Sequence, residues 1–87
     1  MTNIEKDLKD LGYRVHAWSN GPGFWYPVHE HPYHKIIVVQ KGSITFYLPA
    51  EKREVAMKAG ERLEIAPHTA HSAQVGPEGV ACLEGQR

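Results

Sequence analysis

Two histidines of this 87-residue chain, His29 and His31, are separated by a single residue. In an extended strand, residues two apart point to the same face, with a rise of roughly 3.3 Å per residue, so both imidazoles could reach one ion. A third histidine, His71, lies on a later segment. Three histidine nitrogens with an open fourth position form a catalytic zinc site in some enzymes. The pattern predicts a metal site, and the competing interpretation is a pair of hydrogen-bonded core histidines.

Short strands are the elements that would position these side chains. From residue 13 onward, runs rich in Val, Ile, Tyr, Phe and Thr alternate with Gly, Pro and Asn. Regularly spaced short strands are typical of a sandwich or a barrel. We expect strands over residues 13–18, 24–31, 33–40, 43–48, 54–57, 62–65, 70–75 and 80–84.

One short helix is expected over residues 3–11. Thr2 and Glu5 have the spacing of a capping box, and apolar residues such as Leu8 recur with helical spacing. Gly12 follows where helices often end.

The composition argues against several classes of partner. Ten basic residues balance ten acidic ones with no long run of either sign, so no basic surface for nucleic acid is predicted. No apolar run is longer than residues 36–39, which is far too short for a membrane span. The lone Cys82 cannot form an internal disulfide, and the N-terminal stretch lacks a secretory pattern. We therefore expect a cytoplasmic protein that binds neither nucleic acid nor membrane.

Two expected strands, 36–39 and 44–48, are apolar on both faces. A strand of an open antiparallel sheet with one wet face should alternate instead. The helix is expected to be too short to cover both strands, so we predict a homodimer that packs sheet on sheet. The alternative is a bias toward apolar residues in a small core.

Glycines and histidines recur at fixed offsets in two blocks. The blocks are Gly23-x5-His29-x-His31-x10-Gly42 and Gly60-x6-Pro67-x3-His71. In these motifs the chain resembles the cupin superfamily over roughly residues 13–84. The resemblance implies an all-β, antiparallel jelly-roll barrel over residues 13–87 that follows an N-terminal helix within residues 1–12. It also implies a metal inside the barrel, because the three histidines match the ligand positions of the two motifs.

Lys35 departs from the cupin pattern. Cupins commonly place a glutamate ligand three or four residues after the second histidine, where this chain has Lys35 and Ile36. Three neutral ligands would suit zinc, nickel, copper or iron(II), and either hydroxide generation or Lewis-acid chemistry. The favoured interpretation is that Lys35 extends outward past the barrel rim. The alternative is an inward amine depressed toward neutrality, which would be a candidate general base or nucleophile.

Strand parity indicates what else faces the barrel interior. If His29 and His31 face inward, Trp25 and Tyr33 should do so as well, which makes Tyr33 a second candidate catalytic residue beside Lys35. The remaining histidines have other expected places. We expect His34 on the outer surface or at a dimer interface, His68 at a turn position usual for glycine, and His16 in packing.

The leading functional hypothesis is a cupin that binds a divalent metal through His29, His31 and His71. It could catalyse oxygenation, isomerisation or hydration of a small molecule. One alternative is a non-catalytic module that binds or senses a small ligand, and another is a metal-free structural cupin. The fold alone cannot choose among these functions.

Overall fold

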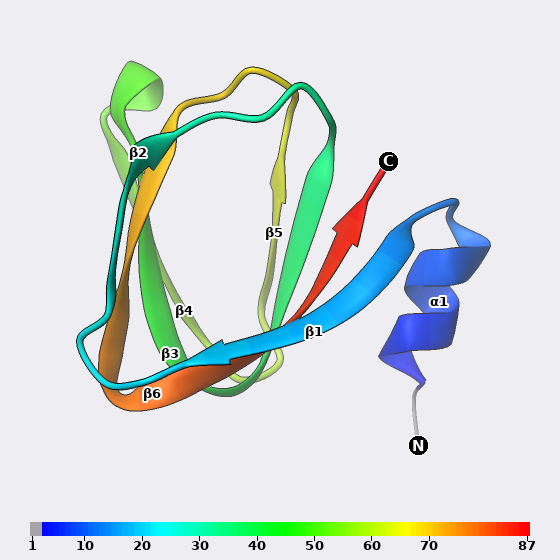
Figure 1. Cartoon of the computed structure of the whole chain (residues 1–87), viewed down its shortest axis with the longest axis horizontal. Helices are drawn as coiled ribbons and strands as arrows, with labels where there is room; N and C mark the ends of the chain where they lie inside the picture. The colour runs from blue at the N-terminus through cyan, green and yellow to red at the C-terminus, as the bar shows by residue number, and fades with distance from the viewer. Residues whose placement is uncertain (1–2) are drawn as a thin grey trace.

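The computed structural model describes residues 3–87 of the chain (Figure 1). Six strands follow one short helix, and a 3-10 turn separates β3 from β4. The elements in chain order are α1 (Ile4–Asp10), β1 (Arg14–Asn20), β2 (Trp25–His29), β3 (Lys35–Leu48), η1 (Pro49–Glu51), β4 (Arg53–Lys58), β5 (Arg62–Ile65) and β6 (His71–Gln86).

The strands wrap around an interior as an antiparallel barrel. β3 and β6 lie side by side in the middle; β1 and β2 pair with β6, and β4 and β5 pair with β3. Every pairing is antiparallel. The first part of β3 pairs with β5 and the second part with β4, so one long strand contributes to both walls of the barrel (Figure 1). The predicted all-β barrel with an N-terminal helix is confirmed.

The prediction of eight strands is wrong, because two pairs of expected strands are continuous. Residues 33–40 and 43–48 fall mostly in β3, and residues 70–75 and 80–84, apart from Ala70, fall in β6. The Gly and Pro signals between them mark bends rather than turns, and the β3–β6 register shifts at these bends. Bulges bend a strand without ending it.

At this bend the backbones of Gly42 and Gly79 pack against each other. Gly42 has a φ of +77°, and a Cβ atom added to it would overlap the carbonyl oxygen of Gly79. Only glycine combines this left-handed conformation with so close an approach. The contact therefore holds the two long strands together where they pass from one wall to the other.

The helix begins and ends close to the predicted limits. The side chain of Asn3 accepts a hydrogen bond from the backbone N–H of Lys6 at 3.0 Å, so Asn3 is the N-cap. The predicted capping residue, Thr2, lies outside the described residues. Gly12 follows the helix with a φ of +91°. Among residues 3–87, no helix has the length and apolar character that a membrane crossing requires.

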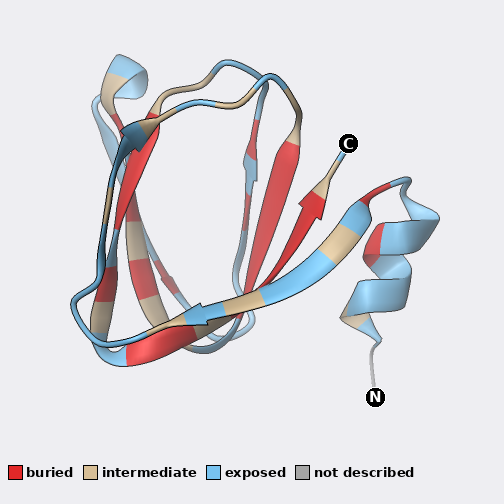
Figure 2. Ribbon diagram, viewed as in Figure 1, coloured by how far each residue is buried: buried red, intermediate tan, exposed pale blue. Residues whose placement is uncertain are grey.

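Buried residues are concentrated on β3 and β6 (Figure 2). The buried apolar side chains form an inner and an outer cluster. The outer one joins Leu8 of α1 and Tyr13 to Ile36, Val38 and Leu83 of the sheet. The helix thus covers the outer face of residues 36–39. Of the two doubly apolar strands that led us to predict a dimer, only 44–48 still lacks such a cover from residues 3–87. The inner cluster lies inside the barrel and consists of Ile37, Val39, Ile44, Phe46, Met57, Leu63, Ile65, Ala73, Val75, Val80 and Cys82.

Candidate metal centre

The structure brings the three predicted histidines together at one end of the barrel interior. His29 ends β2, His31 lies in the loop after it, and His71 begins β6. Each offers a ring nitrogen, and these atoms all lie within 4.8 Å of one another. His29 and His71 are direct cross-strand partners. The sequence predicted a strand over residues 24–31, but β2 ends at His29. His31 therefore lies outside the strand, and its ring still joins the cluster.

Backbone carbonyls fix the tautomer of two of these histidines. The Nδ1 atom of His29 lies 2.7 Å from the carbonyl oxygen of Pro27, and that of His71 lies 2.8 Å from the carbonyl oxygen of Thr69. A carbonyl only accepts, so each Nδ1 carries the proton and each Nε2 has a free lone pair. Histidines that bind metals commonly donate their other N–H to a carbonyl in this way.

His71 also provides a test of whether a metal ion would fit. Its Nε2 atom is buried and has no hydrogen-bond partner among the residues that the structure describes. A buried polar atom without a partner costs about 1–3 kcal/mol. A cation among the three imidazoles would use this lone pair, so the residues present fit a divalent metal.

Burial keeps two of the imidazoles in the form that can bind a metal. It lowers the pKa of His31, and the nearby Lys35 and His29 lower it further. It also lowers the pKa of His71, although the hydrogen bond to Thr69 opposes this shift. Both rings are therefore neutral at neutral pH, as metal ligation requires.

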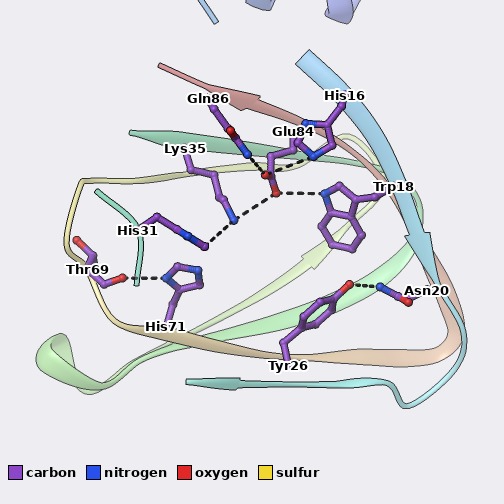
Figure 3. Close-up of polar contacts among 10 residues, drawn as sticks. All are labelled: His16, Trp18, Asn20, Tyr26, His31, Lys35, Thr69, His71, Glu84 and Gln86. Carbon is purple, nitrogen blue, oxygen red and sulfur yellow. Dashed lines mark hydrogen bonds and ion pairs between the residues drawn. The ribbon is translucent and has the colours of Figure 1, made fainter. Parts of the chain in front are cut away.

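Lys35 points inward, so the favoured prediction that it extends outward is wrong (Figure 3). Only 8% of the residue is exposed. Its Nζ atom lies 3.3 Å from Oε1 of Glu84 and 3.4 Å from Nε2 of His31. An ion pair inside the barrel holds the side chain there, which no pattern near Lys35 in the sequence indicates.

Glu84 is the site residue that the sequence analysis missed. It is 6% exposed and lies on β6. Its carboxylate accepts hydrogen bonds from Trp18 Nε1 at 3.2 Å and from Gln86 Nε2 at 2.9 Å, and His16 Nε2 lies 3.6 Å away (Figure 3). The signal that could have found it is a lone charge directly after the apolar run 80–83. A carboxylate that continues a buried run needs a partner inside the protein, because charged residues are almost never fully buried unless they are paired.

A cavity of about 190 Å³ lies beside the histidines. One part of its wall is polar and another is apolar. The lining residues are Trp18, Tyr26, His29, Lys35, Ile37, Ile44, Phe46, His71, Ala73 and Glu84.

The predicted aromatic wall is partly wrong. Trp25 is 54% exposed and faces away from the cavity, because the register shifts between Tyr26 and His29 and reverses the parity. Tyr26 lines the cavity instead. Tyr33 stacks on the ring of His31, with centroids 4.9 Å apart, and is not among the lining residues. Its position is that of a support for His31.

The other three histidines lie outside the cluster. His16 is exposed on β1, so the expectation that it packs is wrong. His34 packs beside Tyr13 of the outer cluster, with ring centroids 6.0 Å apart, which confirms the predicted outer face. His68 has a φ of +59°, as expected at a position usual for glycine, and its backbone N–H donates to the carbonyl of His31 at 2.7 Å. This bond ties the two metal-site loops together.

No protein-family model matches the sequence, and no curated protein matches it. Solved structures do. An RmlC-like cupin from Shewanella frigidimarina is similar with a TM-score of 0.74 at 19% identity, over 85% of this chain and 64% of that one. The polyketide cyclase RemF from Streptomyces resistomycificus is similar with a TM-score of 0.74 at 24% identity, over 85% of this chain and 54% of that one.

The DMSP lyase DddQ from Ruegeria pomeroyi gives a TM-score of 0.79 at 17% identity, over 86% of this chain and 38% of that one. The chain thus spans less than two thirds of the length of each of these three proteins. The strand order, the inner cavity and these likenesses agree with the fold that the sequence motifs implied. The chain has the cupin fold.

Proposed function

We propose that the chain binds one divalent metal ion through His29, His31 and His71 and uses this centre for chemistry on a small molecule. The observation that carries the proposal is the convergence of three ring nitrogens within 4.8 Å of one another. The hydrogen bonds from Nδ1 of His29 and His71 to backbone carbonyls support the proposal. They leave the Nε2 atom of each ring free to bind a metal.

The donor set narrows the choice of metal. Three imidazole nitrogens favour zinc, nickel, copper or iron(II) over magnesium or calcium, which prefer oxygen ligands. A metal in this site would supply Lewis acidity or a water of lowered pKa. The protein residues would hold the ion, orient the ligand and exclude water through the apolar wall.

The cavity supports a small ligand with one polar end. Its volume of about 190 Å³ is below the roughly 300–1,000 Å³ of pockets that take drug-sized molecules. Ile37, Ile44 and Phe46 would contact an apolar part of the ligand, and the polar end would face the histidines and Lys35. Two structurally similar proteins are named as a cyclase and a lyase, which favours an enzyme over a structural role.

The test is the Zn²⁺ stoichiometry of the untagged protein after stripping and reloading. We expect one ion per chain, and loss of binding in His29→Ala, His31→Ala and His71→Ala. His68→Asn is the matched control, because His68 is exposed and outside the cluster, and Asn tolerates its positive φ. Full retention of the metal in two of the three variants would overturn the ligand assignment.

The same Zn²⁺-loaded protein can distinguish an enzyme from a sensing module and from a metal-free structural cupin. Metal-dependent turnover in a panel of small acids and sugars would support catalysis. A bound metal and ligand without turnover would favour the sensing module, and a folded protein without metal would favour the structural cupin. The cytoplasmic location and the homodimer remain predictions, and the dimer would use the outer face that exposes Trp25 and Tyr47.

A further inference from the structure

We propose that Lys35 and Glu84 form an outer part of the metal site and act on the bound ion with opposite sign. In this arrangement the Lys35 ammonium weakens metal binding, and the Glu84 carboxylate offsets it. The inference deepens the proposed function and rests on it, because it concerns the affinity of the three-histidine site. Neither residue is needed as a direct ligand.

The first observation is the chain of contacts from Glu84 to the histidines. Lys35 lies between them, 3.3 Å from the carboxylate and 3.4 Å from Nε2 of His31. An ammonium can only donate, so at His31 it uses the same lone pair that a metal would use. Lys35 therefore opposes the metal both as a competitor for His31 and as a like charge.

The second observation is that both charges are shielded from water. The side chains of Lys35 and Glu84 are 10% and 8% exposed, and both line the cavity with His29 and His71. Charges inside a protein interact more strongly than charges in bulk water. A change of either charge should therefore be measurable at the metal.

The third observation is that Glu84 does not depend on Lys35 for its position. Trp18 Nε1 donates to one carboxylate oxygen and Gln86 Nε2 donates to the other (Figure 3). Removal of the lysine charge would leave a negative charge held in place beside the histidines. Removal of the glutamate charge would leave the ammonium uncompensated. The two substitutions should change metal affinity in opposite directions.

The experiment is a competitive chelator titration with Zn²⁺ on the full chain and on Lys35→Met, Glu84→Gln and the double variant. Met keeps the length of the lysine stem, and Gln keeps an oxygen that can accept from Trp18. We expect about tenfold tighter binding for Lys35→Met and about tenfold weaker binding for Glu84→Gln. The double variant should return close to the parent, because both charges are gone.

Lys41→Met and Glu54→Gln are matched controls at exposed positions outside the cavity, and we expect no change in either. Each single variant leaves a buried charge without its partner, which destabilises proteins. Thermal melts therefore accompany the titrations. If one single variant fails to fold, the other single variant and the double variant still give the sign of each charge effect.

Weaker binding in Lys35→Met, or unchanged binding in Glu84→Gln, would overturn this inference while the parent still bound Zn²⁺. Lack of binding by the parent would instead overturn the proposed function, and this inference with it.

Discussion

His29 and His71 face each other directly across β2 and β6, with ring centroids 4.3 Å apart. Two protonated rings at this separation would place like charges side by side in a partly buried site. The pKa of His71 is lowered mainly by burial, and His29 contributes to the same direction. The contact with His29 therefore favours the neutral form of His71.

The first prediction concerns acid. The pKa values of His31 and His71 are lower in the folded chain, so the unfolded chain binds more protons once the pH falls below about 6.5. The two neutral rings therefore make their full contribution to the free energy of unfolding above that pH. This contribution is lost as the pH falls toward the pKa values of the folded chain. Thermal melts of metal-free protein between about pH 7 and pH 5 should show this loss. His71→Gln should reduce the slope, and a slope equal to that of the parent would contradict the prediction.

The second prediction concerns the outer cluster. Leu8 is fully buried against Tyr13, Ile36 and Val38. Leu8→Ala should lower the free energy of unfolding by about 2–5 kcal/mol, as for other core truncations. Leu11 is 56% exposed, so Leu11→Ala should change it by less than about 0.5 kcal/mol. Denaturant titrations measure both, and equal effects would show that the helix does not anchor the sheet.

The third prediction concerns the bend of the two long strands. Gly42→Ala would force a Cβ into the Gly79 carbonyl at a positive φ, and it should cost at least about 2 kcal/mol of unfolding free energy. Gly21 has no heavy atom within 4 Å of an added Cβ and no positive φ. Gly21→Ala should therefore be neutral in the same titration. A Gly42→Ala protein as stable as the parent would mean that the strands do not approach so closely.

The sequence predicted the barrel and the three histidines because both depend on local patterns. Runs rich in Val, Ile, Tyr, Phe and Thr indicate strands. The i, i+2 spacing of His29 and His31 predicted a shared strand face, whereas His31 reaches the cluster from the loop after β2. The eight expected strands became six because Gly42 and Gly79 permit a bend that resembles a turn in sequence.

The orientation of Lys35 could not be predicted because its partner, Glu84, belongs to a strand far along the chain. Trp25 was misplaced for a related reason. The register shifts between Tyr26 and His29, so Trp25 faces the opposite side from the one obtained by counting back from His29.

The fourth prediction concerns self-association. Trp25 and Tyr47 are 54% and 40% exposed, and exposed aromatic residues are enriched where proteins associate. Light scattering at micromolar concentration should show a dimer, and Trp25→Glu should convert it to a monomer. Lys41→Glu, on β3 at an exposed position, is the control for added charge. A parent that stays monomeric with a cooperative melt would show that α1 and the barrel core suffice alone.

The most direct test of the three-histidine metal site is anomalous scattering at the zinc edge from crystals of the untagged, Zn²⁺-loaded protein. We expect one strong peak inside the barrel, with His29, His31 and His71 nitrogens about 2.0–2.1 Å from it. The peak should disappear in His71→Ala crystals. A peak only at surface histidines such as His16 or His68, or no peak between the three predicted ligands, would contradict the site.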